Sequence, residues 1–124
     1  PKGFISGIDR IQIPCDEELN DKVRAAAGAV EGLACHQGII ATGDQFVGSK
    51  DKLNRLMEEF GAVACEMEGG SIGQVCYINK VPFTVVRAIS DNANDDAHMD
   101  YPKFLKIAVK KSFELLTELM PLLA

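Results

Sequence analysis

Short apolar runs that end in polar or acidic residues recur along the chain. Residues 62–65 (Ala-Val-Ala-Cys) precede residues 66–68 (Glu-Met-Glu), and residues 81–89 (Val-Pro-Phe-Thr-Val-Val-Arg-Ala-Ile) precede residues 90–91 (Ser-Asp). Runs rich in Val, Ile and Phe are typical of strands buried on both faces of a sheet. Ligands bind beyond the carboxyl ends of such strands in open α/β sheets. The pattern therefore predicts two acidic clusters at one rim of a sheet, equipped for acid–base chemistry on a polar substrate.

A third apolar run, residues 38–42, leads into a turn at residues 43–48 (Gly-Asp-Gln-Phe-Val-Gly). Glycine lets the backbone approach a ligand closely, and Phe46 at the tip of the turn is available to stack on a planar ring. The alternative is an ordinary Gly-Asp turn with Phe46 folded back into the core. Because three strand ends together carry polar or aromatic groups, the pattern favours a binding site.

Strand and helix patterns alternate along the sequence. Strands are predicted at residues 4–13, 33–42, 62–65 and 81–89. Helices are predicted at residues 16–29, 50–60, 67–78 and 101–119. This alternation predicts an α/β fold with a largely parallel or mixed sheet and flanking helices.

Local signals support these helices. Asp16 is a suitable N-cap for the first helix, and Gly61 is a natural stop for the second. The third helix contains Gly69, Gly70 and Gly73. Glycines inside a helix lower its stability, so they indicate close approach to a sheet or to another backbone.

Composition narrows the function classes. The chain has 124 residues, 47% of them hydrophobic, and a net charge of −5. These values indicate one globular unit. No nucleic-acid partner is predicted because the net charge is negative, and no membrane partner is predicted because the apolar runs are short. The four cysteines show no Cys-x-x-Cys spacing, and Cys35, Cys65 and Cys76 lie in apolar surroundings, so buried free thiols are expected at these three positions. Free thiols in turn indicate a reducing cytoplasm.

The stretch from residue 38 to residue 101 resembles the 5′-methylthioadenosine/S-adenosylhomocysteine nucleosidases of the nucleoside phosphorylase superfamily. The resemblance rests on residues 43–47 (Gly-Asp-Gln-Phe-Val), 63–68 (Val-Ala-Cys-Glu-Met-Glu) and 85–91 (Val-Val-Arg-Ala-Ile-Ser-Asp). It implies that residues 1–124 form the C-terminal portion of a single nucleoside phosphorylase-like domain whose N-terminal half is absent here. It also implies hydrolysis of an N-glycosidic bond with release of adenine, no cofactor, and a homodimer in which the three glycines of the third helix serve close packing.

The resemblance assigns four residues to the adenine base. Asp91 is implied as the general acid that protonates a ring nitrogen, with Ser90 supporting it by hydrogen bonding. Phe46 is implied to stack on adenine, and the backbone of Val47 to read the edge of the base. A general acid is needed because adenine otherwise departs with negative charge.

Four further residues are assigned to the sugar side. Glu68 is implied to hold the ribose hydroxyls and to help place the attacking water, and Met67 to pack against the sugar. Tyr101 is implied to line the pocket for the 5′-substituent, where the family commonly has phenylalanine. Glu66 is grouped with these substrate-binding residues, and a structural role for it is favoured over a catalytic one.

Each assignment has a structural alternative. Asp91 could instead be a turn or helix-cap residue, and Glu68 a first-turn glutamate stabilised by the helix dipole. Met67 could be a core residue, and Tyr101 a hydrophobic staple for the last helix. His36 and His98 receive no role and form no metal site with the scattered cysteines.

Arg87 falls inside an apolar run, and a buried guanidinium requires a carboxylate partner. Glu66 or Glu68 is the natural candidate because the neighbouring predicted strand ends there. We therefore hypothesise that Arg87 orients one of these carboxylates. The alternative is that Arg87 faces a subunit interface.

Two other functions remain open at this point. A purine nucleoside phosphorylase would use phosphate as the nucleophile, although phosphorylases of this kind carry an arginine soon after the Ser-Asp pair and residues 92–100 contain none. A non-catalytic nucleoside-binding or storage relative would have no chemical need for both Glu68 and Asp91.

Overall fold

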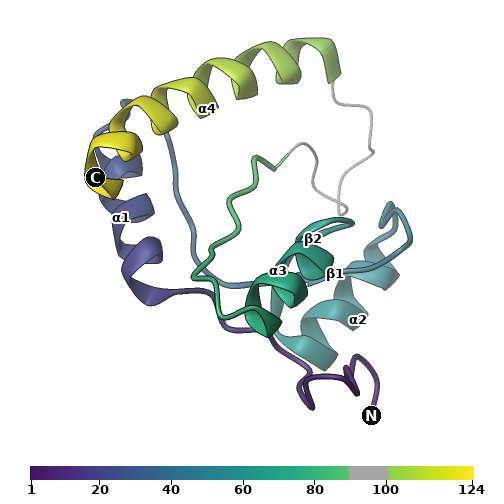
Figure 1. Cartoon of the computed structure of the whole chain (residues 1–124). Helices are drawn as coiled ribbons and strands as arrows, with labels where there is room; N and C mark the ends of the chain where they lie inside the picture. Colours follow the sequence, from purple (N-terminus) through teal and green to yellow (C-terminus); the bar gives the residue numbers. More distant parts are fainter. Residues whose placement is uncertain (90–100) are drawn as a thin grey trace.

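A computed structural model of the protein describes residues 1–89 and 101–124, except for the side chain of Tyr101. The elements in chain order are α1 (Glu17–Gly28), β1 (Ile39–Thr42), α2 (Lys50–Phe60), β2 (Ala62–Glu66), α3 (Gly69–Ile78) and α4 (Tyr101–Leu123). Figure 1 shows β1, β2, α2 and α3 grouped together, with α1 and α4 forming a separate helical corner. The arrangement confirms the predicted α/β class.

The described sheet consists of β1 and β2, which pair in parallel. Their register places Ile39 opposite Ala62 and Thr42 opposite Glu66. Helix α2 connects the two strands, as a parallel pair requires, and begins at a cap where Ser49 accepts a hydrogen bond from the Lys52 amide. Gly61 ends α2 in the left-handed conformation (φ 66°), which confirms its predicted role.

The second packing unit joins α1 to α4. Asp16 caps α1 by accepting a hydrogen bond from the Leu19 amide at 2.9 Å, as predicted. Val23 and Ala26 of α1 form a buried cluster with Leu119 of α4, and Leu115 packs against it. Helix α4 continues beyond the predicted end at residue 119 to Leu123, with Pro121 inside its last turn.

Three predicted strand segments are wrong in whole or in part. Residues 4–13 form turns with one antiparallel bridge between Ile5 and Arg10, and residues 33–38 precede β1 without joining it. Residues 81–89 belong to no strand, although the Asp16 amide donates to the Phe83 carbonyl at 2.7 Å. A strand exists only where a partner strand lies alongside, and no strand of the described residues pairs with these segments.

The glycines of α3 face neighbours within the same chain. A Cβ atom on Gly70 would lie 2.8 Å from Cβ of Thr42, and one on Gly73 would lie 2.9 Å from the ring of Phe83. This confirms the expectation that these glycines allow close approach. The expectation that they also serve packing between subunits stays a prediction.

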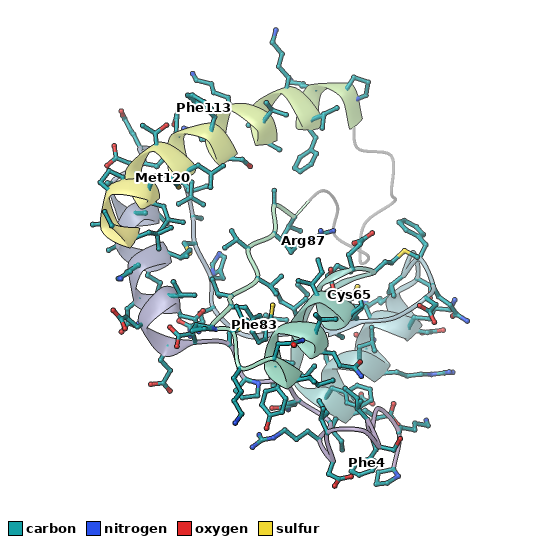
Figure 2. The ribbon with its side chains drawn as sticks, in the orientation of Figure 1. Phe4, Cys65, Phe83, Arg87, Phe113 and Met120 are labelled. Atoms are coloured by element: carbon teal, nitrogen blue, oxygen red, sulfur yellow. The ribbon has the colours of Figure 1, made fainter. Side chains whose placement is uncertain are left out.

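Apolar side chains are exposed over much of the chain. Phe113 and Met120, which Figure 2 labels on α4, are 72% and 61% exposed. Val75 on α3 is 62% exposed. Cys15, Cys35 and Cys76 are free thiols, but Cys35 is exposed, so its predicted burial is wrong. No helix in the described part of the chain is long and apolar enough to cross a membrane.

Candidate functional site

The carboxyl ends of β1 and β2 meet at one edge, as the sequence pattern predicts. Thr42 and Glu66, the last residues of the two strands, lie opposite each other. The Gly43 amide, at the start of the 43–48 turn, donates to the Glu66 carbonyl at 3.1 Å. The turn that carries Phe46 and the turn that carries Glu68 therefore leave the sheet side by side.

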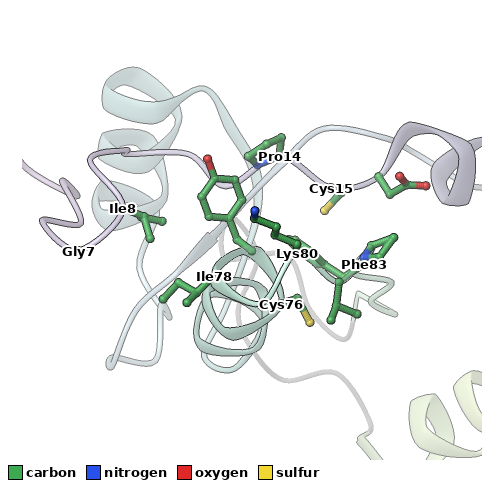
Figure 3. A pocket seen from close by; sticks show the side chains of 12 residues that line it. Gly7, Ile8, Pro14, Cys15, Cys76, Ile78, Lys80 and Phe83 are labelled. Carbon is green, nitrogen blue, oxygen red and sulfur yellow. The ribbon is translucent and has the colours of Figure 1, made fainter.

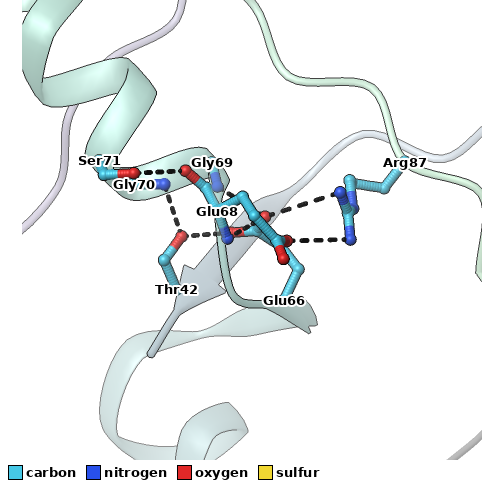
Figure 4. A network of polar contacts seen from close by, with 7 residues as sticks. All are labelled: Thr42, Glu66, Glu68, Gly69, Gly70, Ser71 and Arg87. Carbon is cyan, nitrogen blue, oxygen red and sulfur yellow. Dashed lines mark hydrogen bonds and ion pairs between the residues drawn. The ribbon is translucent and has the colours of Figure 1, made fainter. Parts of the chain in front are cut away.

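Glu66 is enclosed by hydrogen-bond donors (Figure 4). Its Oε1 accepts a hydrogen bond from the Thr42 hydroxyl, and its Oε2 accepts from the amides of Glu68 at 3.0 Å and Gly69 at 2.6 Å. The side chain is only 3% exposed. Both oxygens are committed to the protein, so this carboxylate acts as the cap at the start of α3, whose N-cap residue Glu68 makes no side-chain cap of its own.

These contacts determine the charge state of Glu66. Burial by itself raises the pKa of the carboxyl group, because the charged form loses solvation. The hydrogen bonds from Thr42, Gly69 and Glu68 and the charge of Arg87 act in the opposite direction and prevail, so the pKa of Glu66 lies below its ordinary value. Glu66 is therefore a carboxylate at neutral pH.

Arg87 joins the two glutamates across the site. Its Nη2 lies 3.4 Å from Oε2 of Glu68, and its Nη1 lies 4.0 Å from Oε2 of Glu66. This confirms the hypothesis that Arg87 pairs with the carboxylates at the end of β2. The expectation of a buried guanidinium is wrong, because the Arg87 side chain is 43% exposed.

The remaining described site residues lie at the surface. Phe46 is 67% exposed, so the alternative that it folds into the core is wrong. Its ring lies against Gly48, where a Cβ atom would come within 2.8 Å of Cε1. Met67 is 46% exposed, the Glu68 side chain is 61% exposed, and Val47 is half-buried. Phe46, Met67 and Glu68 are therefore accessible to a ligand.

Ser90, Asp91 and His98 lie outside the described residues, as does the side chain of Tyr101. Among the described residues no group of three or more His, Cys, Asp or Glu side chains is arranged to hold a metal ion.

Thr42 is a site residue that sequence reasoning missed. Its hydroxyl donates to Glu66 and accepts from the Gly70 amide at 2.8 Å. The signal for finding it was present, because a hydroxyl residue ends an apolar run immediately before the glycine turn. Without knowledge of the strand register, however, its opposition to Glu66 could not be inferred.

A cavity of about 680 Å³ lies elsewhere, between the N-terminal segment and the end of α3 (Figure 3). Cys15, Cys76, Tyr77 and Phe83 are among its lining residues. It shares no lining residue with the predicted site. The chemistry-bearing side chains therefore gather at the open strand-end edge and not in this cavity.

The family is shown by comparison with known proteins. A model of the phosphorylase superfamily matches residues 7–121. The chain therefore belongs to the phosphorylase superfamily, which confirms the resemblance seen in the sequence.

Individual relatives are nucleosidases. The chain is 39% identical over 120 residues to an aminodeoxyfutalosine nucleosidase of Helicobacter pylori, covering 97% of this chain and 51% of that protein. It is 37% identical over 121 residues to a 5′-methylthioadenosine/S-adenosylhomocysteine nucleosidase of Glaesserella parasuis, covering 97% of this chain and 48% of that protein. The chain thus spans about half the length of the curated relatives it matches.

A solved structure agrees with these relatives. The 5′-methylthioadenosine/S-adenosylhomocysteine nucleosidase of Neisseria meningitidis, in complex with methylthio-immucillin-A, superimposes with a TM-score of 0.75 and 35% sequence identity. The match covers 86% of this chain and 47% of that structure. The fold of this chain is therefore that of a corresponding part of a nucleosidase.

Proposed function

We propose that this chain is part of a purine nucleosidase that hydrolyses the N-glycosidic bond of 5′-methylthioadenosine and S-adenosylhomocysteine and releases adenine. The observation that carries the proposal is the Glu66–Arg87–Glu68 arrangement at the strand-end edge in a chain of the phosphorylase superfamily. An exposed carboxylate held by an arginine is suited to accept hydrogen bonds from ribose hydroxyls. Nucleosidases among the relatives and solved structures support the same reaction class.

In this proposal the base and the sugar are bound by different residues. Asp91, supported by Ser90, supplies the proton that lets adenine leave without a full negative charge. Phe46 stacks on the base, and the backbone of Val47 reads its edge. The general acid is thus assigned to the adenine side of the scissile bond.

Glu68 holds the ribose hydroxyls and helps to place the water, while Met67 packs against the sugar. Tyr101 lines the pocket for the 5′-substituent. Glu66 belongs to this side of the site through its contacts with the Glu68 amide and Arg87. Charge that develops on the sugar is thus met by fixed carboxylates.

The proposal includes a domain assignment. Residues 1–124 correspond to the C-terminal portion of one nucleoside phosphorylase-like domain, and the complete protein acts as a cytoplasmic homodimer without a cofactor. The shared coverage of about half of each relative supports the assignment.

A specific observation favours a second candidate substrate. The aminodeoxyfutalosine nucleosidase of Helicobacter pylori is as similar to this chain as the methylthioadenosine enzymes are. Both reactions would use the same acid and ribose contacts, and the difference lies in the 5′-substituent. We infer that Tyr101, with a hydroxyl where the methylthioadenosine family commonly has phenylalanine, discriminates between these substrates.

The test is a substrate panel with the natural protein that carries these residues. Adenine release from methylthioadenosine, S-adenosylhomocysteine and aminodeoxyfutalosine is measured for the wild type and for Tyr101→Phe. We expect turnover of methylthioadenosine and S-adenosylhomocysteine, with a relative gain for methylthioadenosine in Tyr101→Phe. Turnover of aminodeoxyfutalosine alone would favour the second candidate, and turnover of none would reject both.

A further inference from the structure

Thr42 connects two elements through a single hydroxyl group. A hydroxyl has one proton to donate and lone pairs to accept with, whereas an amide can only donate and a carboxylate can only accept. The Thr42 hydroxyl must therefore donate to Oε1 of Glu66 and accept from the Gly70 amide, 2.8 Å away. The end of β1 is thereby bonded to both the end of β2 and the first turn of α3 (Figure 4).

Glu66 extends this connection toward the exposed side of the site. Oε2 of Glu66 accepts hydrogen bonds from the amides of Glu68 and Gly69, and it lies 4.0 Å from Nη1 of Arg87. Arg87 in turn lies 3.4 Å from the Glu68 carboxylate. Glu68 is thus held at two points, through its own amide and through its side-chain partner, and Glu66 contacts both.

We propose that Thr42 and Glu66 act as a positioning pair that holds Glu68 and Arg87 in the geometry required for ribose binding, without contacting the substrate themselves. This inference rests on the proposed function. It assigns to Thr42 a role that the sequence pattern did not, and it explains why a carboxylate that is only 3% exposed lies beside a substrate site.

The pair is sensitive to loss of the hydroxyl because the surroundings are tight. A Cβ atom on Gly70 would be 2.8 Å from Cβ of Thr42, so α3 and β1 are already in contact at this point. Valine has the shape of threonine and would fill the same space. It would leave one oxygen of Glu66 without its hydroxyl donor and the Gly70 amide without an acceptor, and the start of α3 would then shift to recover bonds.

The experiment compares three variants of the natural protein that carries these residues. Thr42→Val removes the hydroxyl, Thr42→Ser retains it, and Thr117→Val is the matched control. Thr117 lies on α4 and donates only a local hydrogen bond to the Phe113 carbonyl. Adenine release from methylthioadenosine gives kcat and KM, and thermal unfolding verifies that each variant is folded.

We expect Thr42→Val to lower kcat/KM about tenfold or more, in line with one unsatisfied buried group. Thr42→Ser should restore most of the loss, and Thr117→Val should retain wild-type activity. If Thr42 acts through Glu68, Thr42→Val should cause little further loss of kcat/KM in the Glu68→Gln background, because the effects of coupled residues are not additive. Wild-type kinetics in Thr42→Val, or fully additive losses in the double variant, would overturn the proposal.

A second readout does not depend on turnover. Carbon NMR of the Glu66 carboxyl group is followed against pH in the wild type, Thr42→Val and Thr42→Ser, with Arg87 and Glu68 as the charged groups facing it. We expect Glu66 to titrate at higher pH in Thr42→Val only. If the wild type cleaves no nucleoside, the proposed function fails, and an unchanged titration in Thr42→Val would separately reject the positioning pair.

Discussion

Glu66 remains charged in a nearly closed environment because its two oxygens are matched by donors. The Thr42 hydroxyl and the amides of Glu68 and Gly69 each contribute a hydrogen bond, and Arg87 contributes positive charge. Removal of any one donor leaves part of a buried carboxylate without a hydrogen-bond partner. The free-energy cost of such an unsatisfied group is larger than the stabilisation that an average hydrogen bond provides. Glu68, by contrast, is exposed, and its carboxylate lies 3.4 Å from the Arg87 guanidinium.

The lowered pKa of Glu66 makes stability depend on pH. A carboxyl group whose pKa is lower in the folded than in the unfolded protein stabilises the fold. This contribution is fully present above the pKa of the unfolded state, about 4.5, and is lost as the pH falls through the pKa of the folded state. We expect the free energy of unfolding, measured by urea titration from pH 6 downward, to decline below about pH 4.5 in part because of Glu66. Glu66→Gln should flatten this decline, whereas Glu58→Gln, at an exposed position on α2, should not. An identical decline in both variants would contradict this account of Glu66.

The general-acid assignment predicts a selective loss in Asp91→Asn. An amide has a similar shape to the carboxylic acid but cannot supply the proton, and removing a general acid typically costs about 10²–10⁴-fold in rate. Adenine release by the natural protein should fall by this factor while binding of methylthio-immucillin-A persists. The matched control is Asp9→Asn at an exposed turn with positive φ, which asparagine tolerates. Near-normal turnover in Asp91→Asn would remove Asp91 from the mechanism.

Helix α3 lies in close contact with β1 at Gly70. Gly70→Ala would place a methyl group 2.8 Å from Cβ of Thr42, and overpacking of this kind costs about 1–3 kcal/mol. Alanine gains about 1 kcal/mol in helix propensity, so a net loss of stability is expected. Gly28→Ala at the end of α1 meets no atom within 4 Å and should be neutral or stabilising. Chemical denaturation of both variants measures the difference, and equal stability of the two would contradict the close packing of α3 on β1.

The elements that could be predicted from sequence are those specified by local signals. Capping at Asp16 and the stop at Gly61 define α1 and α2 almost to the residue, and apolar periodicity locates α4. The 81–89 segment has the composition of a strand but forms none, because strand formation depends on a partner distant in sequence. Sequence pattern reports the tendency to be buried in a sheet but does not supply the neighbour.

The candidate site could be predicted in part for the same reason. Parallel strands imply a shared edge, so the meeting of the 43–48 turn with Glu66 and Glu68 was foreseeable, as was the pairing of Arg87. The contact between Thr42 and Glu66 depends on register, which an apolar run of four or five residues does not specify. The enclosed state of Glu66 follows from this contact, and it was therefore inaccessible to sequence reasoning.

The chain as a whole exposes more surface than its mass implies. Its accessible area is 9088 Å², whereas a compact folded chain of 13.4 kDa exposes about 6,500 Å². The difference exceeds the area buried in a standard protein–protein interface, about 1,600 Å². Exposed apolar residues on α3, α4 and residues 81–89, such as Val75, Phe113 and Val86, account for part of this surface. The isolated chain therefore presents large apolar faces to solvent.

We expect residues 1–124 on their own to self-associate and to release no adenine. Exposed apolar faces and unpaired backbone favour association with other chains. Sedimentation velocity and an adenine-release assay on the purified chain measure both properties. A monodisperse monomer with turnover comparable to a complete nucleosidase would contradict both the domain assignment and the need for further contacts around the ribose.

The identity of the nucleophile decides the reaction class. The natural protein that carries these residues is incubated with methylthioadenosine in ¹⁸O-labelled water, with and without inorganic phosphate, and the products are analysed by mass spectrometry. The nucleosidase account predicts adenine and 5-methylthioribose with one ¹⁸O atom at C1, at a rate independent of phosphate. Formation of 5-methylthioribose 1-phosphate, with adenine release that requires phosphate, would contradict it.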